Sequence, residues 1–275
     1  MRPSGIFETT MLRQFWKALK NADRVPEILR CRAEIPHWAR VTAAYLGISQ
    51  LKYPYVLHLH SGERIRMEEV TDLKTFWQVF LRRVYRVEAT DRVILDLGAN
   101  IGIFTLYAAR QAPEARLFSL EPFPATFSRL FATVRDHQLE NRVTCVKHAL
   151  TGSPGIRVMQ DGMIPSQRRS LAPTASAASG AQVFGKTLLE TFEENNLTRI
   201  DLLKMDIEGS EYETLLATPP PVLARIARIA LEYHGDSAPY TKDQLIEHLH
   251  RSGFSSAWDV CDESGYGLTE MIFQK

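Results

Sequence analysis

Charged side chains gather behind two apolar segments in the last third of the chain, and their types suit proton transfer. Asp206, Glu208 and Glu211 follow the segment IDLLKM, and Glu232 and His234 close the segment RIALEYH. The unperturbed pKa of histidine lies near working pH, so His234 is the natural base for removing a proton from a hydroxyl. Glu208 or Glu211 could act if burial raised the carboxyl pKa. The candidate catalytic residues are His234, Asp206, Glu208 and Glu211.

The same acids could hold a cation instead of moving a proton. Asp206, Glu208 and Glu232 offer the oxygen ligands that Mg²⁺ prefers, with His234 as a supporting group. Solvated loop charges without a function are the third reading. The base and the metal therefore both stand as hypotheses, and no metal ligand is assigned from the sequence.

A second set of chemically suggestive residues forms the turn DLGANIG, residues 96–102. Gly98 and Gly102 allow close backbone approach. Their spacing differs from the G-x-G-x-x-G of pyrophosphate-binding turns, because Asn100 stands where the middle glycine would be. The carboxylate of Asp96 would repel a pyrophosphate and attract a cation. The turn therefore favours a ligand with a positive group and no phosphate, such as the ammonium and sulfonium of S-adenosylmethionine, over NAD.

An acid also ends the next apolar segment. Glu121 lies in LEPFP, 25 positions after Asp96. In Rossmann-like nucleoside sites an acid at this place accepts hydrogen bonds from the ribose hydroxyls. Glu121 is therefore expected to bind a ribose.

These residues must be positioned by a sheet. From Asp91 onward apolar segments alternate with helix-like ones, which predicts a parallel, doubly wound α/β sheet that binds ligands at the carboxyl ends of its strands. The last two strands are expected to form an antiparallel hairpin at one edge. The expected strands are Val93–Gly98, Arg116–Glu121, Arg142–His148, Ile200–Ile207, Arg228–His234, Phe254–Val260 and Leu268–Phe273.

The segments DLGANIG, LEPFP, DLLKMDIEGSE and ALEYH resemble, in this order, the signature segments of FkbM-type S-adenosylmethionine-dependent methyltransferases. The resemblance implies a class I methyltransferase fold, Rossmann-like, with the last strand antiparallel, acting on a hydroxyl of a natural product or sugar in secondary metabolism. It also implies the residues that contact the cofactor, with Ala149 near the adenine. These are Asp96, Gly98, Ala99, Asn100, Gly102, Glu121, Pro122, Ala149 and Asp206.

The rest of the chain is divided at residue 70. Residues 1–70 are predicted to be a helical and hairpin extension, and residues 71–275 the methyltransferase domain. Residues 9–47 have apolar side chains at helical spacing, and we expect them to pack on their own domain or on a second copy in a homodimer. A membrane surface is the alternative for this basic amphipathic stretch. A hairpin is expected around Ser61-Gly62, and a helix over residues 71–87.

Two further predictions concern local structure. Ser210 and Glu213 have the spacing of a capping box, which predicts the start of a helix there. Ser166–Ala181 is small, polar and interrupts the alternation of strands and helices. It is interpreted as a lid over the pocket or, alternatively, as a mobile surface loop.

Composition excludes several classes of function. The 275 residues carry a formal net charge of +1, so no basic surface for nucleic acid is expected. No run of about 18 apolar residues occurs, and the N-terminal stretch lacks the apolar core of a signal peptide, so a cytoplasmic protein is expected. The expected partner is a small hydroxylated acceptor. The alternatives are a nucleotide or other N-methyltransferase and a non-catalytic S-adenosylmethionine-binding module.

Overall fold

The computed structural model describes residues 24–159, 171–172, 182–234, 239–261 and 266–274. The chain divides into two compact units, Met1–Arg83 and Val84–Lys275. This division separates two parts of the chain that each pack mainly within themselves. The predicted functional boundary at residue 70 stays a prediction. Within the described residues, no helix combines the length and the apolar character needed to cross a membrane.

In its described residues, 24–83, the first unit contains short helices and one hairpin. In chain order its elements are α2 (Val25–Glu34), α3 (Trp38–Tyr45), β1 (Tyr55–His58), β2 (Arg64–Met67), α4 (Val70–Phe76) and the π-helical η2 (Trp77–Arg82). The expected hairpin is present, since β1 and β2 pair antiparallel. The helix expected over residues 9–47 is divided where it is described, because Pro36 stops α2. Residues 9–23 lie outside the described residues. The helix expected over residues 71–87 ends early, at a left-handed Arg83 (φ 60°).

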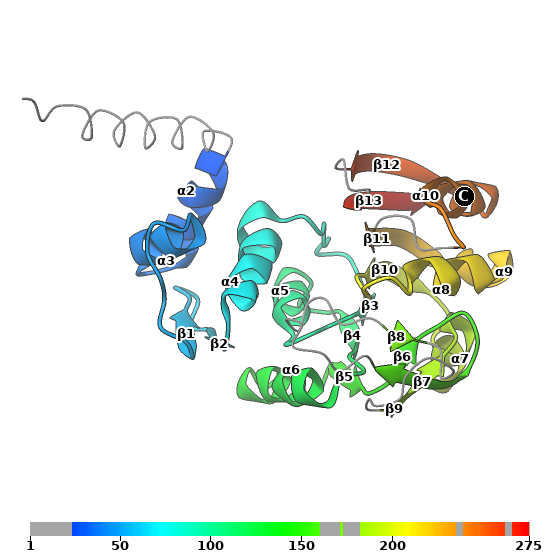
Figure 1. The fold of residues 1–275 in the computed structure, drawn as a ribbon, viewed down its shortest axis with the longest axis horizontal. Coiled ribbons are helices and arrows are strands. Elements are labelled where there is room, and N and C mark those ends of the chain that lie inside the picture. Colours follow the sequence, from blue (N-terminus) through cyan, green and yellow to red (C-terminus); the bar gives the residue numbers. More distant parts are fainter. Residues whose placement is uncertain (1–23, 160–170, 173–181, 235–238, 262–265, 275) are drawn as a thin grey trace, which may run out of the picture. The chain divides into compact units, whose positions relative to one another are not determined.

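The second unit is built on a sheet of seven strands (Figure 1). They are β3 (Val93–Leu97), β4 (Arg116–Leu120), β5 (Val143–Val146), β10 (Ile200–Met205), β11 (Ile226–His234), β12 (Phe254–Cys261) and β13 (Tyr266–Phe273). Their order in the sheet is β12-β13-β11-β10-β3-β4-β5. The strands from β11 to β5 pair in parallel, and β13 runs antiparallel to both of its neighbours. The predicted doubly wound sheet with an antiparallel edge hairpin is confirmed.

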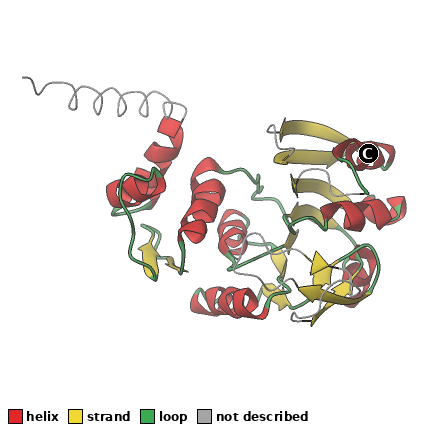
Figure 2. Cartoon of the chain, viewed as in Figure 1, coloured by secondary structure: helices red, strands yellow, loops and turns green. Residues whose placement is uncertain are grey.

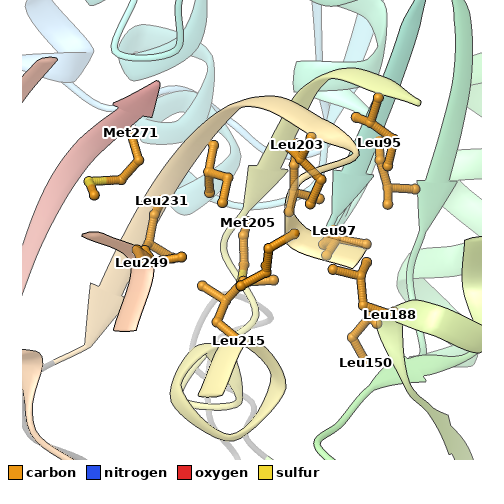
Figure 3. Close-up of a cluster of buried hydrophobic side chains, with 14 of the residues drawn as sticks. Leu95, Leu97, Leu150, Leu188, Leu203, Met205, Leu215, Leu231, Leu249 and Met271 are labelled. Atoms are coloured by element: carbon orange, nitrogen blue, oxygen red, sulfur yellow. The ribbon is translucent and has the colours of Figure 1, made fainter. Parts of the chain in front are cut away.

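Helices follow most of the strands. They are α5 (Ile103–Gln111), α6 (Pro124–Asp136), α7 (Leu188–Glu194), α8 (Glu211–Ala217), α9 (Pro220–Leu223) and α10 (Lys242–Arg251). Alternate strand residues point to opposite faces of a sheet. One face is apolar: Leu97, Met205 and Leu231 pack there with Leu215 of α8 and Leu249 of α10 (Figure 3).

A second, smaller sheet is formed by segments for which the sequence predicted no strand (Figure 2). It contains β6 (Ala149–Leu150), β7 (Gly155–Met159), β8 (Leu171–Ala172) and β9 (Gln182–Lys186), in the order β6-β9-β7-β8. β6 and β8 have two residues each, which is too short for a recognisable periodic signal. Of the predicted lid, Ser166–Ala181, the structure describes the two residues of β8, and the other residues lie outside the described part. The lid stays a prediction.

Candidate functional site

The turn between β3 and α5, here called the glycine loop (residues 98–102), uses three left-handed residues. Their φ angles are +73° at Gly98, +49° at Asn100 and +86° at Gly102. Asparagine tolerates this region far better than most residues, which explains how Asn100 can replace a glycine. A Cβ at Gly98 would lie 1.8 Å from the carbonyl oxygen of Asp206. The loop therefore presses directly against the end of β10.

Glu121 ties the glycine loop to the start of α6. Its carboxylate accepts hydrogen bonds from the backbone N–H of Asn100 (2.9 Å) and of Phe123 (3.0 Å), and from the hydroxyl of Thr126 (2.7 Å). Burial raises the pKa of Glu121 above its usual range. A carboxylate offers about four acceptor positions, so capacity remains for a ribose hydroxyl. That role stays a prediction.

The segment after Glu121 contacts Ala149, the residue that is predicted to lie near the adenine. Phe123, which follows Pro122, packs against the buried Ala149 of β6 and Val183 of β9. The neighbouring His148 is buried, and its Nε2 lies 3.3 Å from the hydroxyl of Thr191. Burial lowers the pKa of His148 to about 4, so this imidazole is neutral at neutral pH.

Asp96 is fully buried on the face of the sheet opposite the leucines. Its carboxylate accepts a hydrogen bond from the hydroxyl of Thr105 on α5 (2.7 Å). The ammonium of Lys204 lies 3.4 Å from its other oxygen. Asp96 does attract a cation, as its place in the sequence suggested, but in this structure that cation is a side chain of the same chain. Contact between Asp96 and the cofactor stays a prediction.

Lys204 is the residue that sequence reasoning missed. Its Nζ donates to the carbonyl oxygens of Gly98 (2.9 Å) and Leu97 (3.2 Å), and lies 3.8 Å from the carboxylate of Asp206. Burial alone would lower its pKa, but Asp96, Asp206 and Glu232 raise the pKa above its usual range. The available signal was a lysine inside an otherwise apolar strand segment, IDLLKM, because lysines are almost never buried without a partner.

The predicted catalytic residues meet where β10 and β11 end, with His234 as the last residue of β11. The Nε2 of His234 lies 3.4 Å from Glu208 and 4.0 Å from Asp206. The strand expected over Ile200–Ile207 ends early, at Met205, and Glu208 in the turn after it is left-handed (φ 53°). A turn, not a strand, brings Glu208 to the imidazole. Burial and the charge of Glu232 raise the pKa of Asp206 well above its usual range.

Glu211 organises this turn from a fully buried position. It accepts hydrogen bonds from the backbone N–H of Ile207 (3.0 Å) and Gly209 (2.7 Å), and it lies 3.1 Å from Nδ1 of His234. The predicted helix start is confirmed, since Ser210 is the N-cap of α8, but the predicted capping box is wrong, because the Ser210 side chain makes no capping hydrogen bond. Glu211 therefore satisfies the N–H groups of the turn and also orients the imidazole.

The three carboxylates decide the charge of His234. Burial alone would lower its pKa, but the hydrogen bond and charge of Glu211, together with Asp206 and Glu208, raise the pKa to about 9. The side chain is 22% exposed. The imidazole is therefore protonated at neutral pH, and it can act as a base only after it loses that proton.

The residues do not fit Mg²⁺. Donor atoms of Asp206, Glu232 and His234 do lie within 4.8 Å of one another. However, Glu232 accepts a hydrogen bond from the hydroxyl of Tyr85 (2.7 Å), and Lys204 already places a positive charge beside Asp206. Mg²⁺ prefers oxygen ligands in near-octahedral geometry, and a protonated imidazole offers no lone pair. We assign no step to a metal.

Known proteins resemble this chain over the same region. Residues 96–256 match the family model described as Methyltransferase FkbM domain. The AMB antimetabolite synthetase AmbE of Pseudomonas aeruginosa is 28% identical over 238 residues, which cover 71% of this chain and 11% of AmbE. Methyltransferase 1 of Beauveria bassiana is 32% identical over 158 residues, covering 50% of this chain and 64% of its own.

A third relative is covered more fully. The 31-O-demethyl-FK506 methyltransferase FkbM of Streptomyces tacrolimicus is 26% identical over 210 residues, which cover 65% of this chain and 78% of that protein. Among solved structures, M. capricolum TrmK in complex with S-adenosylhomocysteine aligns with 70% of this chain and 67% of its own, at a TM-score of 0.44 and 11% identity. That likeness is too low to support an inference.

The family match includes the glycine loop, Glu121 and the cluster around His234, and it spans more than half of the chain. The chain covers less than two thirds of AmbE and of Methyltransferase 1, so the activities of those whole proteins do not transfer with the match. The chain belongs to the FkbM methyltransferase domain family.

Proposed function

We propose that this protein transfers a methyl group from S-adenosylmethionine to a hydroxyl of a small molecule, such as a natural product or a sugar. Membership of the FkbM methyltransferase domain family supports the reaction class. One relative is named as a methyltransferase of 31-O-demethyl-FK506, a name that describes an oxygen lacking its methyl group. The near-neutral net charge of the chain favours a small acceptor over a nucleic acid.

The observation that carries the proposal is the direct contact between the glycine loop and the acidic end of the site. The backbone N–H of Asp206 donates to the carbonyl oxygen of Leu97 (3.2 Å), immediately before the loop. The Nε2 of His234 lies 4.0 Å from the carboxylate of Asp206. A donor held by the loop would therefore lie beside groups that can bind and deprotonate an acceptor.

S-adenosylmethionine supplies a methyl group that is already activated on a sulfonium. The protein must then align a hydroxyl and accept its proton. His234 is suited to the second task because Glu211 fixes its Nδ1, so that Nε2 faces Asp206 and Glu208. A positive charge bound nearby lowers the pKa of an imidazolium. Binding of the cationic donor therefore favours the neutral imidazole that the reaction requires.

Calorimetry with S-adenosylmethionine, S-adenosylhomocysteine and NAD tests the cofactor directly. We expect both adenosyl compounds to bind and NAD to bind more weakly, because the loop lacks the pyrophosphate fingerprint. Tighter binding of NAD would overturn the proposal. Release of S-adenosylhomocysteine in the presence of hydroxylated acceptors then tests turnover. Tight binding of the cofactor without turnover on any acceptor would indicate a binding module.

A further inference from the structure

Three polar residues form a row across the central strands, on the face of the sheet opposite the leucines. Ser119 of β4 pairs in register with Asp96 of β3, and Asp96 pairs in register with Lys204 of β10. All three are buried, with Lys204 3% exposed. The hydroxyl of Thr105 lies 2.9 Å from that of Ser119 and closes the row from α5. A chain of polar contacts therefore leads from Ser119 through Thr105 and Asp96 to Lys204, along one face of the sheet.

Lys204 is the point at which this row meets both ends of the site. Its ammonium contacts two carbonyl oxygens at the glycine loop and lies near the carboxylate of Asp206. The rings of Tyr85 and Phe104 lie over it, with centroids 5.7 Å and 6.0 Å from Nζ. The ammonium is enclosed on several sides and cannot move without breaking these contacts.

Structural stability alone does not require this arrangement. Burial of a charge is costly even when it is paired, and well-packed apolar residues often replace a buried ion pair without loss of stability. The contacts of Lys204 differ from those of an ordinary buried pair, because they include backbone carbonyls of the cofactor loop. A cation at this position sets the distance between that loop and Asp206.

We propose that Lys204 is a positioning residue of the transfer reaction: its buried ammonium joins the glycine loop to Asp206 and so fixes the spacing between the cofactor and the acceptor end of the site. The proposal rests on the proposed function, since it assumes that the loop binds S-adenosylmethionine. It does not place Lys204 in contact with either substrate.

The chain offers a matched control in Arg228, a buried cation on the neighbouring strand β11. Its guanidinium bonds to both carboxylate oxygens of Asp91 (2.7 Å each) and to Glu270 (3.2 Å). Lys204→Met and Arg228→Met therefore each remove one buried positive charge from a central strand. Arg228 makes these hydrogen bonds away from the glycine loop. Only Lys204→Met therefore removes a contact with the backbone carbonyls at that loop.

The experiment measures the affinity of the full chain for S-adenosylhomocysteine by calorimetry, with thermal unfolding of each variant recorded in parallel. We expect both variants to unfold at lower temperature. We expect Lys204→Met to weaken binding by at least about tenfold, and Arg228→Met to change it by less than about twofold. An affinity unchanged in Lys204→Met, or lowered equally in Arg228→Met, would refute the role of Lys204.

A charge-balanced variant covers the case in which Lys204→Met does not fold. Asp96→Asn combined with Lys204→Met removes the cation together with its buried counter-ion, which avoids an unpaired charge. This double variant should bind S-adenosylhomocysteine at least about tenfold more weakly than Asp96→Asn alone. Equal affinities would overturn the proposal. Failure of the unchanged chain to bind S-adenosylhomocysteine would instead overturn the proposed function, and this inference with it.

Discussion

At the scale of single residues, the site is governed by an excess of carboxylates around two cations. Lys204 and His234 lie among Asp96, Asp206, Glu208 and further acids. Each cation holds its proton more strongly because of these neighbours, although burial opposes the charged form. The histidine that looked like a ready base in the sequence is therefore an imidazolium at neutral pH. Its chemistry depends on what binds beside it.

The charge of His234 gives a measurable pH dependence. Its folded pKa of about 9 lies above the usual value near 6.5. The protonated form stabilises the fold below pH 6.5, and this contribution is lost as the pH rises through about 9. NMR titration of the imidazole should show the raised pKa, and Glu211→Gln should lower it by removing the nearest charge. A midpoint near 6.5 in the unchanged chain would contradict the arrangement described here.

The rate of turnover should also depend on the protonation state of His234. His234→Ala should lower the rate of methyl transfer by roughly 10²–10⁴-fold, which is the usual contribution of a general base, and leave S-adenosylhomocysteine binding nearly intact. The rate of the unchanged enzyme should rise with pH, since only the neutral imidazole accepts a proton. A rate that is independent of pH between 6 and 9 would remove His234 as the base.

A chelator distinguishes this base from a metal. Because Lys204 places a positive charge beside Asp206 and Tyr85 donates a hydrogen bond to Glu232, we expect EDTA to leave the rate unchanged and added Mg²⁺ to have no effect. Activity that is abolished by the chelator and restored by Mg²⁺ would show that the carboxylates release these partners and bind an ion.

At the scale of elements, the glycine loop and the end of β10 form one packed unit. The close approach at Gly98 leaves no room for a side chain. Gly102 differs, because a Cβ there would meet the flexible end of Leu130 at 3.0 Å. Both glycines are left-handed, so substitution at either carries the backbone cost. The steric cost is much larger at Gly98.

This difference between the two glycines can be measured. Strain at a left-handed position costs about 1–3 kcal/mol. The free energy of unfolding of Gly102→Ala should therefore be lower than that of the unchanged chain by about this amount. Gly98→Ala should lose more stability and should bind S-adenosylhomocysteine at least tenfold more weakly, because Asp206 must move. Chemical denaturation and calorimetry provide both values. Equal effects at the two positions would mean that the loop and β10 are not packed together.

At the scale of the whole molecule, the strands and the glycine loop were predictable from the sequence, and the positions of the charges were not. Segments such as VILDL are near-continuous apolar runs that alternate with helix-like segments, and Gly98, Asn100 and Gly102 indicate backbone geometry locally. Lys204 pairs with Asp96, and Glu211 forms a hydrogen bond with His234. Both contacts depend on which strands become neighbours in the sheet. A linear pattern does not encode that information, and it also misses strands as short as β6.

The polar row has a consequence for how the sheet assembles. A slip of one residue between β3 and β10 would turn the side chains of one strand to the opposite face. Lys204 would then enter the cluster that contains Leu97 and Leu231, and Leu203 or Met205 would face Asp96. Central strands that are apolar on both faces could tolerate such a slip. Here the misaligned sheet would leave two opposite charges apart in an apolar interior, so the row that supports the site also selects the correct pairing of the strands during folding.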